Sequence, residues 1–236
     1  MRNATLGRDR LTLCPPAATG DLATRLIDGA EVGVDDETLL ASAYTVAALE
    51  WAEEPPAEPV PALFDDEDAL FAPTLAGGVV LLPENPDRRT WTAGELARRL
   101  DGRAWCAVAS GPRARISSSH TEAVDVLALV RASRRPPGVY ELDDVLVEYA
   151  VARNDAVSDR LVSLIRSLKS SPTLFDTLAV LVRVDHNRNR AAAELFIHRS
   201  TLDYRLGRVE EITGFHPLSR RGSQLFSLAM TMFALS

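Results

Sequence analysis

The chain has 236 residues, of which 46% are hydrophobic and 25% are charged, as in an ordinary folded protein. No apolar run approaches the roughly eighteen residues of a membrane-spanning helix, and no apolar signal core follows the N-terminus, so we expect a cytoplasmic protein without membrane contact. The net charge of −7 argues against general affinity for nucleic acid, although the charge is unevenly distributed.

The first and last parts of the chain differ in charge. Residues 1–171 carry 18 basic and 27 acidic groups, a net of −9. Fourteen of these carboxylates lie between Asp21 and Asp68, where Arg25 is the sole basic residue. Residues 172–236 carry eight arginines and six carboxylates, a net of +2. We therefore expect the first part to repel a phosphate backbone and the last part to tolerate one.

The first region, residues 1–74, is predicted to contain two helices and a linker. A weak helix is expected near Asp21–Asp28 and a stronger one over Asp36–Ala52, where apolar residues form a broad surface. The stretch Glu53–Pro73 is rich in proline and acid, a composition that buries little apolar area. We interpret it as a linker, an acidic surface loop, or both.

The second region, residues 75–152, alternates between strand and helix signals. Helices are expected after Thr92 and after Ser119, because each is followed by a glutamate at capping-box spacing. This alternation predicts a small mixed sheet with helices packed against it. The pair Asp143-Asp144 has no third metal ligand in view and is interpreted as a helix start or part of a loop. Strands are predicted at Gly78–Leu82, Arg103–Ala109 and Val139–Leu142.

Cysteine and histidine spacing predicts no metal site. Cys14 and Cys106 are far apart and have no neighbouring ligand, so both are interpreted as unpaired, small apolar residues. His186, His198 and His216 are too widely spaced to bind one ion together. We therefore expect no metal and no cofactor.

The third region, residues 155–236, is helical in pattern and contains a candidate helix-turn-helix. Asn187 is suited to cap a short helix that ends near Leu195, and the alanines 191–193 allow a second helix to cross closely. The second helix is expected to start at His198 or Arg199. Its predicted inner face comprises Leu202, Leu206 and Val209.

The outer face of the second helix carries the side chains that could contact DNA. Arg199 and Thr201 are the best candidates to contact bases, because the N-terminal residues of a recognition helix point into the major groove. Arg205 and Arg208 are expected to contact phosphates. The alternative is an amphipathic helical hairpin whose arginines only keep its outer face soluble.

A family resemblance supports the DNA-binding interpretation. The two helices contain the run Leu195-Phe196-Ile197-His198-Arg199-Ser200-Thr201-Leu202-Asp203-Tyr204-Arg205-Leu206, followed by Arg208-Val209-Glu210-Glu211-Ile212-Thr213-Gly214. This run resembles the C-terminal helix-turn-helix of PucR/CdaR-family transcription regulators. The resemblance implies that Leu195, Ile197, Leu202 and Leu206 are core residues. The DNA-binding set that we expect is Asn187, Arg188, His198, Arg199, Ser200, Thr201, Tyr204, Arg205 and Arg208.

Two residues depart from the family pattern. Ser200 replaces the usual asparagine, which is a mild change. Asp203 would repel phosphate unless it accepts a hydrogen bond from cytosine or pairs with Arg199 or Arg208.

The second region resembles the degenerate GGDEF-like domain of the same family. The similarity rests on residues 105–111, 122–127 and 138–144. The Gly-Gly-Asp/Glu-Glu-Phe signature of an active cyclase is missing, so the resemblance implies no enzymatic activity.

These features predict a bacterial-type regulator that binds double-stranded DNA as a homodimer, with recognition helices about one turn of DNA apart. Any small-molecule effector is unknown, and its site is expected to be small or absent. One alternative is a sequence-tolerant architectural DNA-binding protein. The other is a nucleotide-processing enzyme on the GGDEF-like fold.

Overall fold

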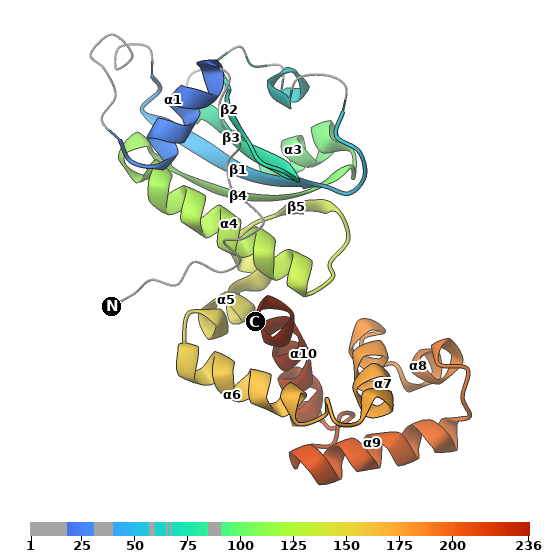
Figure 1. Cartoon of the computed structure of the whole chain (residues 1–236). Helices are drawn as coiled ribbons and strands as arrows, with labels where there is room; N and C mark the ends of the chain where they lie inside the picture. Colours follow the sequence, from blue (N-terminus) through green and yellow to red (C-terminus); the bar gives the residue numbers. More distant parts are fainter. Residues whose placement is uncertain (1–17, 31–39, 57–59, 65, 67, 85–90) are drawn as a thin grey trace. The chain divides into compact units, whose positions relative to one another are not determined.

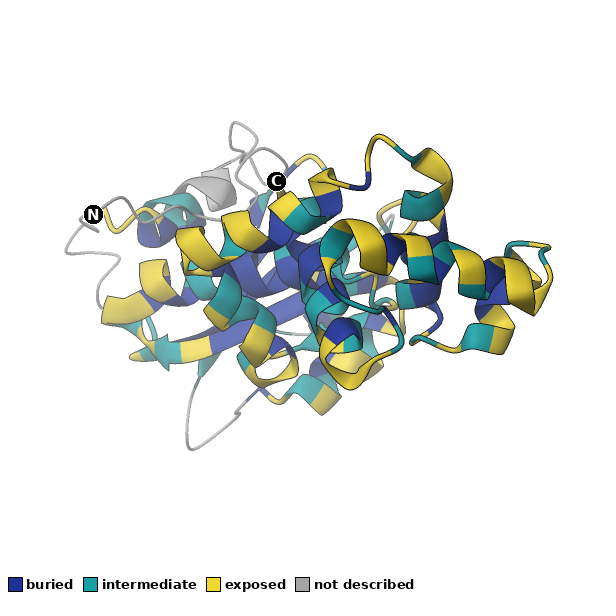
Figure 2. Cartoon of the chain, turned by 90° about the horizontal axis from the view of Figure 1, so that it is seen from below, coloured by how far each residue is buried: buried dark blue, intermediate teal, exposed yellow. Residues whose placement is uncertain are grey.

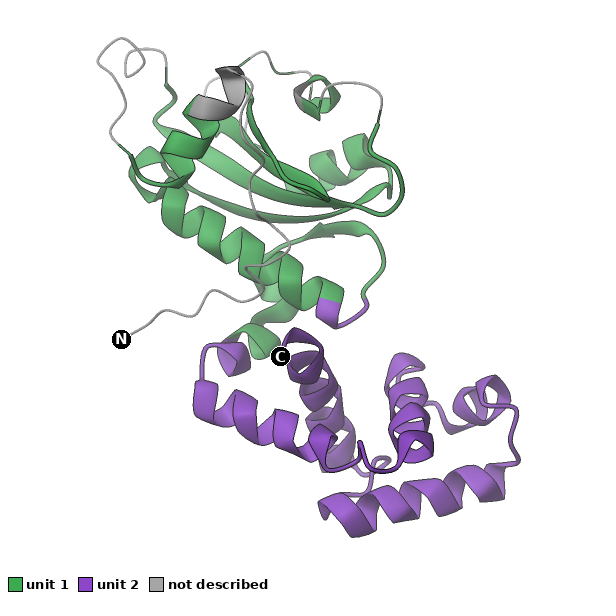
Figure 3. Ribbon diagram, in the orientation of Figure 1, with its two compact units in different colours: residues 1–131, 135–149 green, residues 132–134, 150–236 purple. Residues whose placement is uncertain are grey.

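The computed structural model describes residues 18–30, 40–56, 60–64, 66, 68–84 and 91–236 (Figure 1). The chain forms two compact units (Figure 3). Residues 1–131 and 135–149 make up the α/β unit, and residues 132–134 and 150–236 make up the helical unit. The predicted fold class, a mixed α/β region followed by an all-α region, is confirmed. No helix within the described ranges is both long and apolar enough to cross a membrane.

The α/β unit is built on a five-stranded sheet with strand order β2-β3-β1-β4-β5. The central strand β1 (Ala43–Trp51) pairs antiparallel with β3 (Gly77–Glu84) and with β4 (Ala104–Pro112). The edge strand β2 (Leu70–Pro73) pairs antiparallel with β3, and β5 (Gly138–Tyr140) pairs parallel with β4. The predicted mixed sheet is therefore confirmed, as are its three expected strands.

The helix expected over Asp36–Ala52 is wrong. Residues 36–39 lie outside the described ranges, and residues 43–51 form strand β1. Both faces of this strand are buried, so its sequence is almost continuously apolar and does not alternate. A short run of this kind cannot be distinguished from a buried helix by periodicity. The first and second predicted regions thus contribute strands to one sheet.

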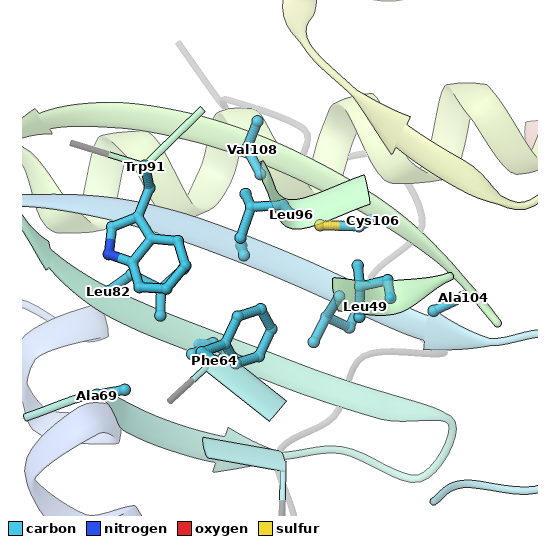
Figure 4. Packing of buried hydrophobic residues seen from close by; sticks show 12 residues of the cluster. Leu49, Phe64, Ala69, Leu82, Trp91, Leu96, Ala104, Cys106 and Val108 are labelled. Atoms are coloured by element: carbon cyan, nitrogen blue, oxygen red, sulfur yellow. The ribbon is translucent and has the colours of Figure 1, made fainter. Parts of the chain in front are cut away.

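Helices cover both faces of the sheet (Figure 1). On one face, α1 (Ala18–Ile27) and the start of α4 (Ile116–Ala132) pack against strand residues that include Tyr44 and Val46. On the other face, α3 (Ala93–Leu100) and the 3-10 helix η1 (Val60–Phe64) enclose an apolar core (Figure 4). This core includes Leu49, Phe64, Leu82, Trp91, Leu96 and Cys106.

The stretch predicted as a linker is partly structured. Phe64 is fully buried, and its ring meets the Trp91 ring edge-on at a centroid distance of 6.0 Å. Ala72 in β2 is also fully buried. The apolar residues that lie between the prolines and the acidic groups bury enough area to fix these segments to the sheet. The linker interpretation is therefore wrong for η1 and β2.

The two predicted capping boxes of the α/β unit differ in outcome. Thr92 caps α3, where its Oγ1 accepts a hydrogen bond from the Glu95 amide at 3.2 Å. Ser119 is not a cap, because α4 begins at Ile116 and Ser119 is buried within it. Asp144 lies in the 3-10 helix η3 (Leu142–Val145), where its carboxylate accepts from the Glu141 amide, so the predicted helix-start role is confirmed.

Cys106 is buried and unpaired, as expected, and its burial raises the pKa of the thiol. Cys14 lies outside the described residues. Within the described ranges, no cluster of three or more His, Cys, Asp or Glu side chains could hold a metal ion.

After strand β5, the regular elements of the described chain are all helices. Helix α5 (Leu146–Ala152) is followed by α6 (Asp155–Arg166), α7 (Pro172–Arg183) and α8 (Arg188–Glu194). Helices α9 (Arg199–Thr213) and α10 (Arg220–Leu235) complete the helical unit. Helix α10 packs against α6 and α7, and its Phe226 and Ala229 are fully buried. The helices carry both buried and exposed residues, whereas the strands are mostly buried (Figure 2).

Candidate nucleic-acid interface

Helix α8 begins and ends where the sequence predicts. The Asn187 side chain caps it, and its Oδ1 accepts hydrogen bonds from the Asn189 and Arg190 amides, both at 3.1 Å. The helix ends in a Schellman motif, in which the Phe196 amide donates to the Ala193 carbonyl and the Ile197 amide donates to the Ala192 carbonyl. The chain then turns directly into α9.

Helix α9 starts at the predicted position. His198 is its N-cap and accepts a hydrogen bond from the Ser200 amide through Nδ1 at 3.3 Å. The C-cap of the helix is Gly214, which has a φ of 78°. The three predicted inner residues are fully buried, namely Leu202, Leu206 and Val209.

Small residues allow α8 and α9 to pack closely. Ala191 is fully buried and Ala192 is nearly so. Both belong to an apolar cluster with Leu202 and Leu206 of α9, against which Leu195 and Ile197 also pack. This confirms the predicted core of the helix-turn-helix and fixes which face of α9 points outward.

The outward face of α9 is polar and accessible. Ser200, Thr201, Tyr204 and Arg208 are exposed and lie opposite the buried residues of the helix. Tyr204 has 70% of its surface exposed. The amides of the first turn carry the positive end of the helix dipole, which favours an anion at this position.

The arginines of this region differ in what they contact. Arg188 pairs with Asp203 at 3.1 Å, and Arg208 pairs with Glu211. Arg205 is half-buried and donates from Nη1 to Thr177 Oγ1 of α7 at 3.2 Å. One donor of each of these three predicted DNA-contacting side chains is thus already engaged within the unit.

Two further arginines have no partner among the residues that the structure describes. Arg199 and Arg190 are exposed, and neither forms an ion pair or a side-chain hydrogen bond within the part of the chain that the structure describes. Arg199 belongs to the predicted set, whereas Arg190 does not. Sequence alone cannot distinguish Arg188 from Arg190, because the ion pair of Arg188 with Asp203 joins two helices.

Asp203 has a different partner from those anticipated. Of the partners considered for it, neither Arg199 nor Arg208 is used, because its carboxylate pairs with Arg188 at the start of α8. Both side chains remain accessible, with exposed fractions of 40% and 43%. The carboxylate therefore neutralises one cation of the candidate interface.

The support behind the two helices comes from α7 and α10. His186 follows α7, and its Nε2 lies 3.0 Å from Ser227 Oγ of α10. Burial lowers the pKa of His186, although a hydrogen bond of the ring to the Pro217 carbonyl and the charge of Asp185 act in the opposite direction. Gly222 of α10 lies so close to the preceding loop that an added Cβ would come 2.0 Å from the His216 carbonyl oxygen.

Together, a capped short helix, a tight turn and a second helix with one buried and one polar face define a helix-turn-helix domain, a DNA-binding fold. Residues 174–232 match the model of the PucR C-terminal helix-turn-helix domain. The chain therefore carries a C-terminal helix-turn-helix of the PucR type, as the sequence resemblance implied.

The chain also resembles a protein of known structure. The crystal structure of a regulator of polyketide synthase expression from Bifidobacterium adolescentis aligns with 91% of both chains at 17% identity, with a TM-score of 0.41. No curated protein matches the chain. The family match lies wholly within the helical unit, so the degenerate GGDEF-like character of the α/β unit stays a prediction.

Proposed function

We propose that this protein is a sequence-specific DNA-binding transcription regulator that inserts the N-terminal part of α9 into the major groove. The observation that carries the proposal is Arg199, which is exposed in the first turn of α9 and has no ion-pair partner among the described residues, while Leu202, Leu206 and Val209 of the same helix are fully buried. Arg199 and Thr201 contact base edges, and His198, Ser200 and Tyr204 lie beside them in the major groove of the DNA. Arg205 and Arg208 contact phosphates, with Asn187 and Arg188 at the edge of the interface.

The regulator acts as a homodimer in this proposal, with two recognition helices about 34–36 Å apart on a pseudo-palindromic site. The α/β unit supplies dimerisation or a response to an effector and carries out no catalysis. Regulation of transcription requires contact with the chromosome, so we place the protein in the cytoplasm.

The test starts from a pool of genomic fragments of the source organism. Purified protein is used to select bound fragments, and affinity for a selected duplex is compared with affinity for a shuffled duplex of the same composition across salt concentrations. We expect the selected duplex to bind at least a thousandfold more tightly, as is typical of specific regulators. Sedimentation of the protein alone and with the duplex gives its oligomeric state.

Other outcomes correspond to the alternatives. Equal affinity for both duplexes with a steep loss in salt would indicate an architectural DNA-binding protein. The acidic α/β unit disfavours that function, because its charge repels DNA outside the specific site. Turnover of nucleoside triphosphates with magnesium would indicate the nucleotide-processing enzyme. Lack of preference for any fragment at moderate ionic strength would refute the regulator assignment.

A further inference from the structure

Phe196 occupies the turn between α8 and α9 and is almost completely exposed, with 95% of its surface accessible. Its neighbours Leu195 and Ile197 pack against the apolar cluster beneath the turn, whereas Phe196 does not. Its backbone has a φ of 53°, the left-handed conformation that a Schellman motif requires just after the helix end.

The fold itself gives no reason for a phenylalanine at this position. Left-handed backbone is unfavourable for a bulky side chain, and glycine or asparagine is the usual residue there. An exposed ring also contributes no burial to the folded state. Both effects predict that the helical unit would be at least as stable with asparagine at position 196. Unfavourable conformations of this kind often mark functional sites.

The surroundings of Phe196 identify the chemistry of a partner. It lies two residues before the N-cap His198, next to the positive end of α9. Arg190 on one side of the turn and Arg199 on the other are exposed, with no ion-pair partner among the described residues. An exposed apolar ring in a turn whose two flanking helices each carry an exposed arginine fits a ligand that has both anionic and apolar surfaces. Duplex DNA has both, since thymine methyl groups and deoxyribose carbons lie beside the phosphates.

We propose that Phe196 is a further DNA-contacting residue, whose ring packs on the apolar atoms at the edge of the groove that receives α9. This inference rests on the proposed function. The side chain adds affinity without adding charge, while Arg190 and Arg199 hold the flanking phosphates or bases.

The experiment uses Phe196→Asn in the full chain and the selected duplex described above. We expect a five- to tenfold loss of affinity, the size of an ordinary interface contact. The slope of affinity against salt stays unchanged, because no charge is removed. The thermal midpoint stays equal or rises, because asparagine tolerates the left-handed backbone. Leu75→Asn is the matched control, since Leu75 is an apolar side chain of the α/β unit with 81% exposure, and it leaves DNA affinity unchanged.

A duplex with uracil in place of thymine separates the two kinds of apolar surface. If the ring contacts thymine methyl groups, this duplex weakens the wild-type protein and leaves Phe196→Asn unaffected. If the ring contacts deoxyribose, the change from thymine to uracil leaves the ratio between the affinities of the wild-type protein and of Phe196→Asn unchanged.

Three results distinguish this inference from the proposed function. Wild-type affinity in Phe196→Asn would overturn the role of Phe196 and leave the regulator assignment standing. A lower thermal midpoint in Phe196→Asn would also overturn it, because the ring would then support the fold. Failure of the wild-type protein to prefer any duplex would overturn both.

Discussion

The arginines of the α/β unit and those of the α8–α9 region differ in what they contact. In the α/β unit, the Arg131 guanidinium lies 3.6 Å from the centre of the Trp105 ring and 3.1 Å from the Glu50 carboxylate. In the α8–α9 region, Arg190 and Arg199 extend from the surface without an ion-pair partner among the described residues. The role of an arginine therefore depends on its partner, which neither the count of arginines nor the net charge reveals.

The exposed arginines of α9 can bind DNA together only if the helical unit holds this helix rigidly, and Gly222→Ala should break that rigidity. The added Cβ would collide with the His216 carbonyl oxygen, so we expect destabilisation of about 3 kcal/mol, the upper part of the usual overpacking range. DNA affinity is expected to fall together with the thermal midpoint of the helical unit. Gly207→Ala in α9 is the control, because nothing lies within 4 Å of its added Cβ, and it should stabilise by about 0.5–1 kcal/mol. Equal thermal midpoints for Gly222→Ala and Gly207→Ala would contradict the packing described for α10.

Arg131→Ala tests the other side of the comparison. Loss of the ion pair and of the contact with the Trp105 ring should cost the α/β unit about 1–2 kcal/mol. DNA affinity should stay at the wild-type value, measured by titration of the selected duplex at a temperature where both proteins are folded. A variant of normal stability that binds DNA poorly would place Arg131 at the interface.

His186 makes the stability of the helical unit depend on pH. Burial lowers its pKa in the folded state, so folding favours the neutral ring. The contribution of the neutral His186 ring to the stability of the folded state is present in full above the unfolded-state pKa of about 6.5. It is lost as the pH falls through the lower folded-state pKa. We expect the thermal midpoint to fall between pH 7 and pH 5, and to fall less in His186→Asn. His120→Asn is the control for the α/β unit, since burial also lowers the pKa of His120, against the opposing charge of Asp28. An unchanged pH profile in His186→Asn would refute the assignment.

Asp203→Asn should produce the smallest effect. It removes a carboxylate from the candidate interface and releases Arg188 from its ion pair. Affinity should rise slightly for any duplex at low salt, and the slope of log affinity against log salt should steepen by about 0.9 if Arg188 then contacts one phosphate. Stability should change by less than about 1 kcal/mol, because the pair is exposed. A loss of specific binding would indicate instead that Asp203 contacts a base.

The helical unit could be predicted from the sequence in detail because its signals are local. Asn187 caps α8 through amides two and three residues away, and the spacing of Leu202, Leu206 and Val209 defines the buried face of α9. The α/β unit was less predictable. Strand β1 is buried on both faces by partners far along the chain, and this long-range burial removes the alternation that would identify a strand.

Within the candidate interface, the residue types were predictable and their pairing was not. The ion pair between Arg188 and Asp203 joins two helices, and the hydrogen bond of Arg205 reaches α7. Neither contact follows from spacing along one helix. The exposure of Phe196 was also missed, because an apolar residue between two core residues resembles part of the core.

Binding of Arg199→Ala to matched and shuffled duplexes tests the central claim most directly. If Arg199 forms a bidentate contact with a base, the variant loses about 1–3 kcal/mol of affinity for the selected duplex and much less for the shuffled one. The thermal midpoint should be unchanged, since Arg199 is exposed and has no ion-pair partner among the described residues. Equal losses on the two duplexes would assign Arg199 to a phosphate, and no loss on either would contradict the placement of the first turn of α9 in the groove.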